Sequence, residues 1–137
     1  DILSIKLEID FKHKYFILGM QLYNVQQAII CTTISNISNI PDKHEQLVVN
    51  SFNTRGIGAE SKRKAIFSWL KNNHTAQNNY TFLQETHSHE SVENIWIKQW
   101  GAHIEFSHGS SNSRRVAILF PKNLSFEIKS KKLDSNG

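Results

Sequence analysis

Two stretches decide the fold: Leu47-Val48-Val49-Asn50-Ser51-Phe52-Asn53 and Thr81-Phe82-Leu83-Gln84-Glu85. Each is a short, β-prone apolar run that ends on a residue able to offer oxygen to a hard cation, Asn53 in the first and Glu85 in the second. A strand, helix, strand order favours a parallel pair, and the ends of parallel strands meet at the same rim of one sheet. The pattern therefore predicts an α/β protein with a rim that suits magnesium.

Residues 61–72, between the two stretches, have the spacing of an amphipathic helix. Two pairs lie one helical turn apart and are expected to share a buried face: Ala65 with Trp69, and Ile66 with Leu70. On this reading Trp69 is a core residue rather than a platform for stacking bases. The basic side chains are expected to project elsewhere: Lys62, Arg63, Lys64 and Lys71.

Regular patterns also occur outside this central part of the chain. Residues 3–11 alternate apolar and polar side chains, as a half-buried strand does. Residues 92–100 have helical spacing, and a turn-rich connection joins two further strands at 103–107 and 115–120. The alternation at 124–128 predicts another strand. By contrast, residues 35–46 are rich in Ser, Asn, Asp and Lys and are expected to form a loop or linker.

The positive charge of the chain is concentrated in its second part. Residues 1–46 carry four Lys against five Asp or Glu, whereas residues 47–137 carry twelve Lys or Arg against seven acidic residues. An excess of positive charge suits a polyanionic partner such as DNA or RNA. The composition is that of a globular domain, and no apolar run is long enough to span a membrane.

Two groups of segments resemble a known family. The first group resembles the start of an endonuclease/exonuclease/phosphatase (DNase I-like) domain: Ser51–Gly56, Ser61–Lys64 with Trp69–Lys71, and Phe82–Ser88. The second group is similar to the apurinic-type endonuclease of LINE-type (non-LTR) retrotransposon proteins: Trp100–Gly109 and Ser110–Phe120. The resemblance covers residues 47–137 and implies the N-terminal part of a DNase I-like two-sheet α/β sandwich, incomplete, with helices outside. Residues 1–46 are then an N-terminal extension of unknown structure.

The resemblance also assigns roles to residues. It implies that Glu85 is the carboxylate that binds Mg²⁺ and that Asn53 is the amide beside the metal and the scissile phosphate. Both would be catalytic, and the implied activity is magnesium-dependent nicking of DNA at a retrotransposon target. The remaining candidates would contact nucleic acid: Arg55, Lys62, Arg63, Lys64, His87, Arg114 and Arg115.

The sequence departs from the family pattern in three places. Arg115 stands where the family has a glycine, so that Arg114 and Arg115 either reach phosphate from a tolerant strand or mark a decaying copy. Asn79-Tyr80 replaces an acidic and an aliphatic residue. The family's later tyrosine, aspartate-x-asparagine and aspartate-histidine motifs do not occur, and Asp134 is the only aspartate after Asp42. The base that activates water is therefore missing, and the isolated chain is expected to be inactive or nearly so.

Other interpretations of the sequence stay open. The chain could be a noncatalytic nucleic-acid-binding remnant, a phosphatase of the same superfamily, or a degenerate product that does not fold. The histidines do not have the spacing of a common zinc site: His87, His89, His103 and His108. His108, in a predicted turn, is expected at the surface. A single cysteine, Cys31, predicts no disulfide-linked partner. Oligomeric state and localisation are open, although a protein that cuts chromosomal DNA would act in the nucleus.

Overall fold

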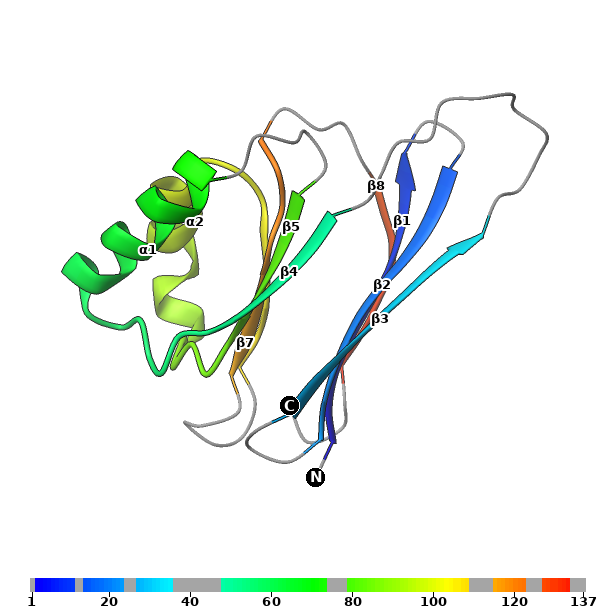
Figure 1. Cartoon of the computed structure of the whole chain (residues 1–137), viewed down its shortest axis with the longest axis horizontal. Coiled ribbons are helices and arrows are strands. Elements are labelled where there is room, and N and C mark those ends of the chain that lie inside the picture. The colour runs from blue at the N-terminus through cyan, green and yellow to red at the C-terminus, as the bar shows by residue number, and fades with distance from the viewer. Residues whose placement is uncertain are drawn as a thin grey trace. The chain divides into compact units, whose positions relative to one another are not determined.

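Strands β4 (Val48–Asn53) and β5 (Asn79–Gln84) lie parallel and side by side in a computed structural model of the chain. Their register pairs Val48 with Asn79 and Asn53 with Gln84. The structure describes residues 2–11, 14–23, 27–35, 48–73, 79–108, 115–122 and 127–133. The predicted parallel pair is thus confirmed, and it brings the ends of the two strands together (Figure 1).

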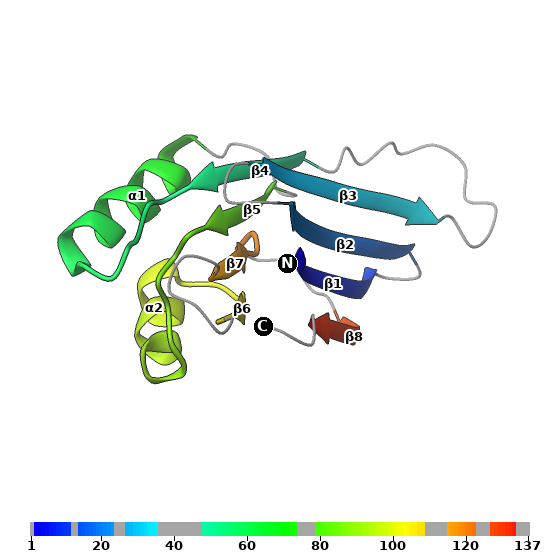
Figure 2. The same ribbon diagram turned by 90° about the horizontal axis from the view of Figure 1, so that it is seen from below.

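The chain divides into two compact units, and β4 and β5 belong to the second, residues 46–124. Its mixed sheet has the order β4-β5-β7-β6, with β6 at Ile104–Ser107 and β7 at Val116–Leu119. β7 runs antiparallel to both of its neighbours. Helices α1 (Glu60–Asn73) and α2 (Glu93–Trp100) lie on one side of this sheet, and a short 3-10 turn, η1 (Glu90–Val92), precedes α2 (Figures 1 and 2). A mixed α/β fold is thereby confirmed.

The core of this unit lies between the two helices and the sheet. Alternate residues of each strand face the helices, because side chains alternate along a strand. The buried residues of this cluster come from helices, strands and a connecting loop: Ile57, Phe67, Leu70, Leu83, Trp96, Trp100, Ile104, Phe106, Ala117 and Leu119. Residues on the opposite face of the strands, such as Phe82 and Ile118, are also buried. Burial on both faces explains the nearly continuous apolar runs in the sequence.

Helix α1 forms where it was predicted, and the face it turns to the core matches the prediction in part: Leu70 is buried and Ile66 packs against the core, but Ala65 and Trp69 are exposed. Its buried residues are Arg63, Phe67 and Leu70, whereas Trp69 has 54% of its surface exposed. The prediction that Trp69 is a core residue was wrong, and so was the placement of Arg63 on the solvent side. Arg63 is only 4% exposed because three acceptors and an aromatic ring satisfy its guanidinium group, as described below.

The first unit, residues 1–45 and 125–137, contains the other sheet. Strands β1 (Ile2–Phe11), β2 (Lys14–Tyr23) and β3 (Gln27–Ser35) form an antiparallel meander. β8 (Glu127–Leu133) pairs with β1, which gives the order β3-β2-β1-β8. The predicted strand at 3–11 is confirmed. The expected division at residue 46 differs from this arrangement, because the last strand of the chain belongs with the first 45 residues.

Candidate functional site at the rim of the parallel strands

The two chain segments remain joined by backbone hydrogen bonds after the parallel strands end. Thr54 N donates to Gln84 O (3.0 Å), Gly56 N to Glu85 O (2.7 Å), and Ile57 N to Thr86 O (3.1 Å). The hydroxyl of Thr54, which is buried, donates to the same stretch of carbonyls. We call residues 53–57 and 84–88 the rim. Its backbone is held on both sides, so its side chains project from a fixed frame.

Three residues of the rim have left-handed backbone conformations. The φ angles are +47° at Arg55, +51° at Glu85 and +54° at His87, and these are all the non-glycine residues with positive φ in the described parts of the chain. An L-residue in this region costs about 1 to 2 kcal/mol, so a fold keeps it only where other interactions determine the backbone. Such strain is concentrated at functional sites in proteins, which directs attention to this rim.

The side chains of Asn53 and Glu85 meet at the rim, as the sequence predicted. Asn53 Nδ2 donates to Glu85 Oε1 at 3.0 Å, and Asn53 Oδ1 accepts from Arg55 N at 3.0 Å. If the amide of Asn53 were flipped, its oxygen would face the Glu85 carboxylate and its N–H group would face the N–H group of Arg55. These two partners therefore fix the orientation of the amide. Asn53 therefore orients the carboxylate of Glu85 through its N–H group.

His87 lies against Gly56. A Cβ atom at Gly56 would come within 2.7 Å of His87 Nδ1, and Gly56 itself has φ of +80°. Only glycine permits both this dihedral angle and this close approach. The side chain of Thr86 is fully buried, whereas Glu85 is partly exposed and His87 is exposed. The rim therefore presents Glu85 and His87 to solvent on either side of a buried threonine.

The predicted basic contacts are in different environments. Arg55 is exposed at the rim, and Lys62 Nζ donates to Thr54 O (2.8 Å) and Arg55 O (3.3 Å), so its charge lies beside the rim. Lys64 instead pairs with Glu60 at 2.5 Å on the exposed side of α1. That hydrogen bond and charge lower the pKa of Glu60 below its ordinary value.

Arg63, by contrast, is turned away from any external ligand. Its guanidinium donates to Ile57 O (3.0 Å), Gly58 O (2.8 Å) and Gln99 Oε1 (2.6 Å), and it lies 5.1 Å from the centre of the Trp96 ring. Burial lowers its pKa from the ordinary value for arginine. In this fold Arg63 anchors the segment between β4 and α1, so the expectation that it contacts nucleic acid is corrected.

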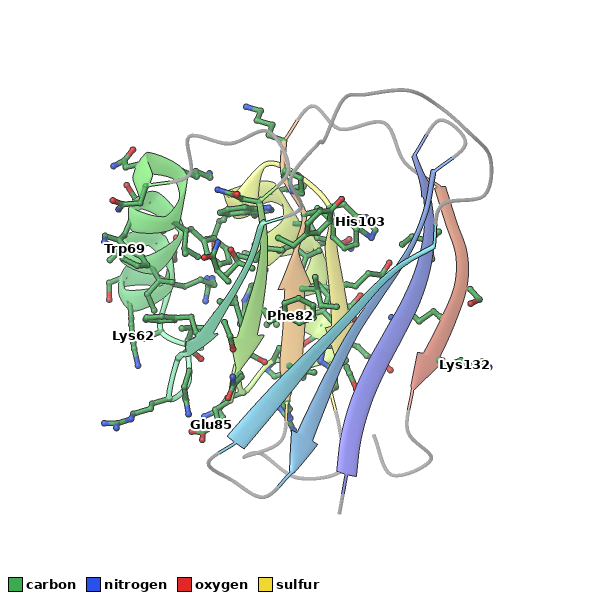
Figure 3. The ribbon with its side chains drawn as sticks, turned by 45° about the vertical axis from the view of Figure 1, so that its right-hand side comes forward. Lys62, Trp69, Phe82, Glu85, His103 and Lys132 are labelled. Atoms are coloured by element: carbon green, nitrogen blue, oxygen red, sulfur yellow. The ribbon has the colours of Figure 1, made fainter. Side chains whose placement is uncertain are left out.

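Figure 3 shows Glu85 at one end of the strands and His103 at the other. At the same end of the sheet as Glu85, a hydrogen-bonded chain that the sequence did not predict supports the rim. His108 Nε2 lies 2.6 Å from Glu93 Oε1, His108 Nδ1 lies 3.0 Å from Ser88 Oγ, and Ser88 Oγ lies 2.9 Å from Thr86 Oγ1. The expectation that His108 is a surface residue was wrong, because only 20% of its side chain is exposed. Ser88 stands beside a histidine but is fully buried, and its hydroxyl takes part in this hydrogen-bonded chain.

Arg115 also supports the rim. Its backbone carbonyl accepts from Thr86 N at 2.9 Å, and its Nη1 donates to Ser88 O at 2.6 Å. The arginine that replaces the expected glycine thus holds the segment that carries Glu85 and His87. Arg114 lies outside the described residues.

The donors at the rim fit magnesium better than zinc. Within the described residues, no three His, Cys, Asp or Glu side chains gather closely enough to form a metal cluster. Magnesium needs fewer protein ligands, because it usually keeps several waters and takes one or two carboxylates. Glu85 offers such a carboxylate, and one hydrogen bond from Asn53 leaves it further lone pairs.

Comparison of the chain with protein-family models, with characterised proteins and with solved structures found no match. In the described part of the chain, the helices are too short and too polar to cross a membrane.

Proposed function

We propose that the rim binds Mg²⁺ through Glu85 and receives a phosphodiester of DNA beside it. On this proposal the chain carries the metal-binding half of a magnesium-dependent endonuclease with a DNase I-like sandwich fold, of the kind found in LINE-type retrotransposons. The observation that carries the proposal is the Asn53–Glu85 hydrogen bond across the ends of two parallel strands, in a backbone that is strained at three positions.

The residues of the chain have distinct parts in this function. Glu85 would hold the metal, and Asn53 would fix the direction of that carboxylate. A bound Mg²⁺ would supply positive charge to the phosphate and to the leaving oxygen. Arg55 and Lys62 place further positive charge beside the rim, where they would attract phosphate. No aspartate occurs between Asp42 and Asp134, so residues 47–133 supply no aspartate as the base that activates water.

The proposal is tested by magnesium binding before activity. Titration of the chain with Mg²⁺, followed by NMR of backbone amides, should perturb residues of the rim and should fail to do so in Glu85→Gln. Glu90→Gln provides the matched control, since Glu90 is an exposed carboxylate that begins η1. If Mg²⁺ perturbs the wild-type and Glu85→Gln rims equally, the proposal is wrong.

A DNA-binding assay separates the endonuclease proposal from simple nucleic-acid binding. We expect Mg²⁺ to tighten binding of a DNA duplex to the wild-type chain and to have no such effect in Glu85→Gln. Salt-sensitive binding that is the same in both proteins, with and without Mg²⁺, would instead indicate a noncatalytic binding protein. Nicking of supercoiled plasmid by the chain alone is expected to be undetectable. Efficient nicking that Glu85→Ala abolishes would contradict the expectation that the chain lacks a base to activate water, and it would support the metal site.

A further inference from the structure

A cavity of about 340 Å³ lies beside α1 and β4, separate from the rim. β4 contributes Asn50, Ser51 and Phe52, and the C-terminal half of α1 contributes Trp69, Leu70 and Asn73. The lining consists of aromatic, aliphatic, amide and hydroxyl groups, and none of the eight described residues that line the cavity is ionisable. A ligand that fits this lining is therefore uncharged where it enters the cavity.

Trp69 gives the cavity a flat aromatic wall. The indole is 54% exposed, and it rests on the ring of Phe52, with centroids 5.9 Å apart and planes tilted by 38°. An aromatic ring behind the indole restricts its orientation and so lowers the entropy lost when a second ring stacks on the other side.

The polar groups of the cavity can form hydrogen bonds with the edge of a bound ring. Asn73 Nδ2 donates to Trp69 O (2.8 Å), which leaves the amide oxygen of Asn73 as an acceptor. Asn50, on the face of β4 that also carries Phe52, adds a second amide group to the lining. A planar, neutral ring with donors and acceptors on its edge matches a stacking surface bordered by such groups. Nucleobases have these properties.

From this lining we infer that the Trp69 cavity binds one unpaired nucleobase of single-stranded nucleic acid. The bases of a duplex are stacked on one another, so only an unpaired base presents a free face to the indole. The helix connects the cavity to the basic side of the rim: Trp69 lies seven residues after Lys62, which is about 10 Å of helix rise. Figure 3 shows both side chains on α1. A strand with a phosphate near Lys62 could thus place a neighbouring base at Trp69.

Tryptophan fluorescence provides the first measurement. Of the three tryptophans, Trp96 and Trp100 are buried and only Trp69 is exposed, so base stacking should quench mainly Trp69. We would titrate the chain without Mg²⁺ with a short oligothymidylate and with an abasic oligonucleotide of the same length and charge. Oligothymidylate should quench the emission and bind about tenfold more tightly than its abasic counterpart. Equal binding and equal quenching by the two would overturn the inference.

Variants and a mononucleotide complete the test, with binding followed by anisotropy of a labelled oligonucleotide. Trp69→Leu should remove the preference for the base-containing strand, and Trp69→Phe should restore part of it. Ile95→Ala is the matched control, because Ile95 is a similarly exposed apolar residue on α2 and should leave the preference unchanged. A preference that survives Trp69→Leu would contradict the site. Thymidine monophosphate that binds as tightly as the oligonucleotide would contradict the assignment to a strand.

The inference does not depend on the magnesium site. All of these titrations omit Mg²⁺, and the comparison of base-containing with abasic strands can be repeated in Glu85→Gln with the same expected result. Failure of base recognition would thus leave the rim proposal intact, and failure of magnesium binding would leave the Trp69 cavity intact.

Discussion

The two ends of the β4-β5-β7-β6 sheet each carry a histidine and a glutamate whose nearest atoms are 2.6 Å apart. At the end opposite the rim, His103 directly precedes β6 and Glu105 lies on it, so their contact is local to one segment. At the rim end, His108 follows β6 and reaches Glu93 on α2, and the chain of hydrogen bonds continues to the Ser88 and Thr86 hydroxyls. At the end opposite the rim the His103 ring also packs edge-on against the Phe120 ring, with centroids 4.9 Å apart, whereas at the rim end hydrogen bonds between side chains link three segments.

This difference shows where the fold concentrates its polar interactions. The rim backbone is strained at Arg55, Glu85 and His87. Outside the rim, Gly101 after α2 is the only one of the described residues that has a positive φ. Glycine accepts that conformation at little cost, but a larger residue does not. A strained rim needs support from several segments, and the hydrogen bonds of three side chains provide it: Arg63, His108 and Arg115.

The largest expected effect comes from removing the buried cation under the rim. Arg63 is the donor to Ile57 O, Gly58 O and Gln99 Oε1. Because Arg63→Ala leaves these acceptors unpaired, it should destabilise the fold by about 3 kcal/mol or more. The matched control is Lys64→Ala, which loses only an exposed ion pair and should have a much smaller effect. Urea denaturation measures both, and similar losses in the two variants would show that Arg63 does not anchor the rim.

The second effect separates backbone strain from a steric clash. A Cβ at Gly56 would introduce both backbone strain and a clash, because φ is +80° and the atom would lie 2.7 Å from His87 Nδ1. Gly101, at φ of +81°, has open space around it, and Gly58 has neither a positive φ nor a close neighbour. We expect Gly56→Ala to cost about 2 kcal/mol and Gly101→Ala about 1 kcal/mol. Gly58→Ala should be neutral or slightly stabilising. Thermal or urea unfolding should give this order, and equal losses at Gly56 and Gly58 would contradict it.

These first two effects also show what sequence could and could not predict. The apolar runs ending at Asn53 and Glu85, with a helix between them, were enough to predict parallel strands and the meeting of those two side chains. The orientation of α1 was only partly predictable from its own residues, since Leu70 faces the core as expected but Trp69 does not. The buried position of Arg63 depends on Gln99 and Trp96, which lie far along the chain, and nothing local distinguishes it from the neighbouring lysines.

The support of the rim was missed for the same reason. His108 was expected at the surface because it lies in a turn between two strands, yet its partners come from the loop after β5 and from α2. A sequence signal for this hydrogen-bonded chain would require knowledge that residues 86–88, 93 and 108 meet. Only the sheet order and register supply that information.

The third prediction compares the two histidines directly. Ser88 and Thr86 are buried, and His108 is a hydrogen-bond partner of Ser88. His108→Gln disturbs these buried groups and should destabilise the fold by about 1 to 2 kcal/mol. His103→Gln should cost less, about 0.5 to 1 kcal/mol, because it loses the contacts with Glu105 and with the Phe120 ring but leaves no buried hydroxyl group without its partner. Urea denaturation measures both losses.

A magnesium titration then decides what His108 does. If His108 positions the rim, only His108→Gln should also weaken the effect of Mg²⁺ on the rim amides, and His103→Gln should leave that effect unchanged. Equal effects of the two variants on magnesium binding would assign His108 a purely structural role.

The smallest expected effect has the opposite sign and tests whether the rim is strained. Arg55 has φ of +47°, whereas Ser51 lies in the extended backbone of β4. Arg55→Gly removes an L-side chain from the left-handed region and should stabilise the fold by about 0.5 kcal/mol while weakening DNA binding. Ser51→Gly should instead destabilise it by about 1 to 2 kcal/mol, because glycine loses more conformational freedom in a strand and because the hydrogen bond from Gln84 Nε2 to Ser51 Oγ is lost.

Urea midpoints that move in opposite directions in these two variants would indicate that the rim retains a costly conformation for binding rather than for stability. If both substitutions destabilise the fold, the left-handed conformation at Arg55 carries little strain. Its presence beside Glu85 would then no longer support a functional site, and the case for the rim would rest on the Asn53–Glu85 hydrogen bond alone.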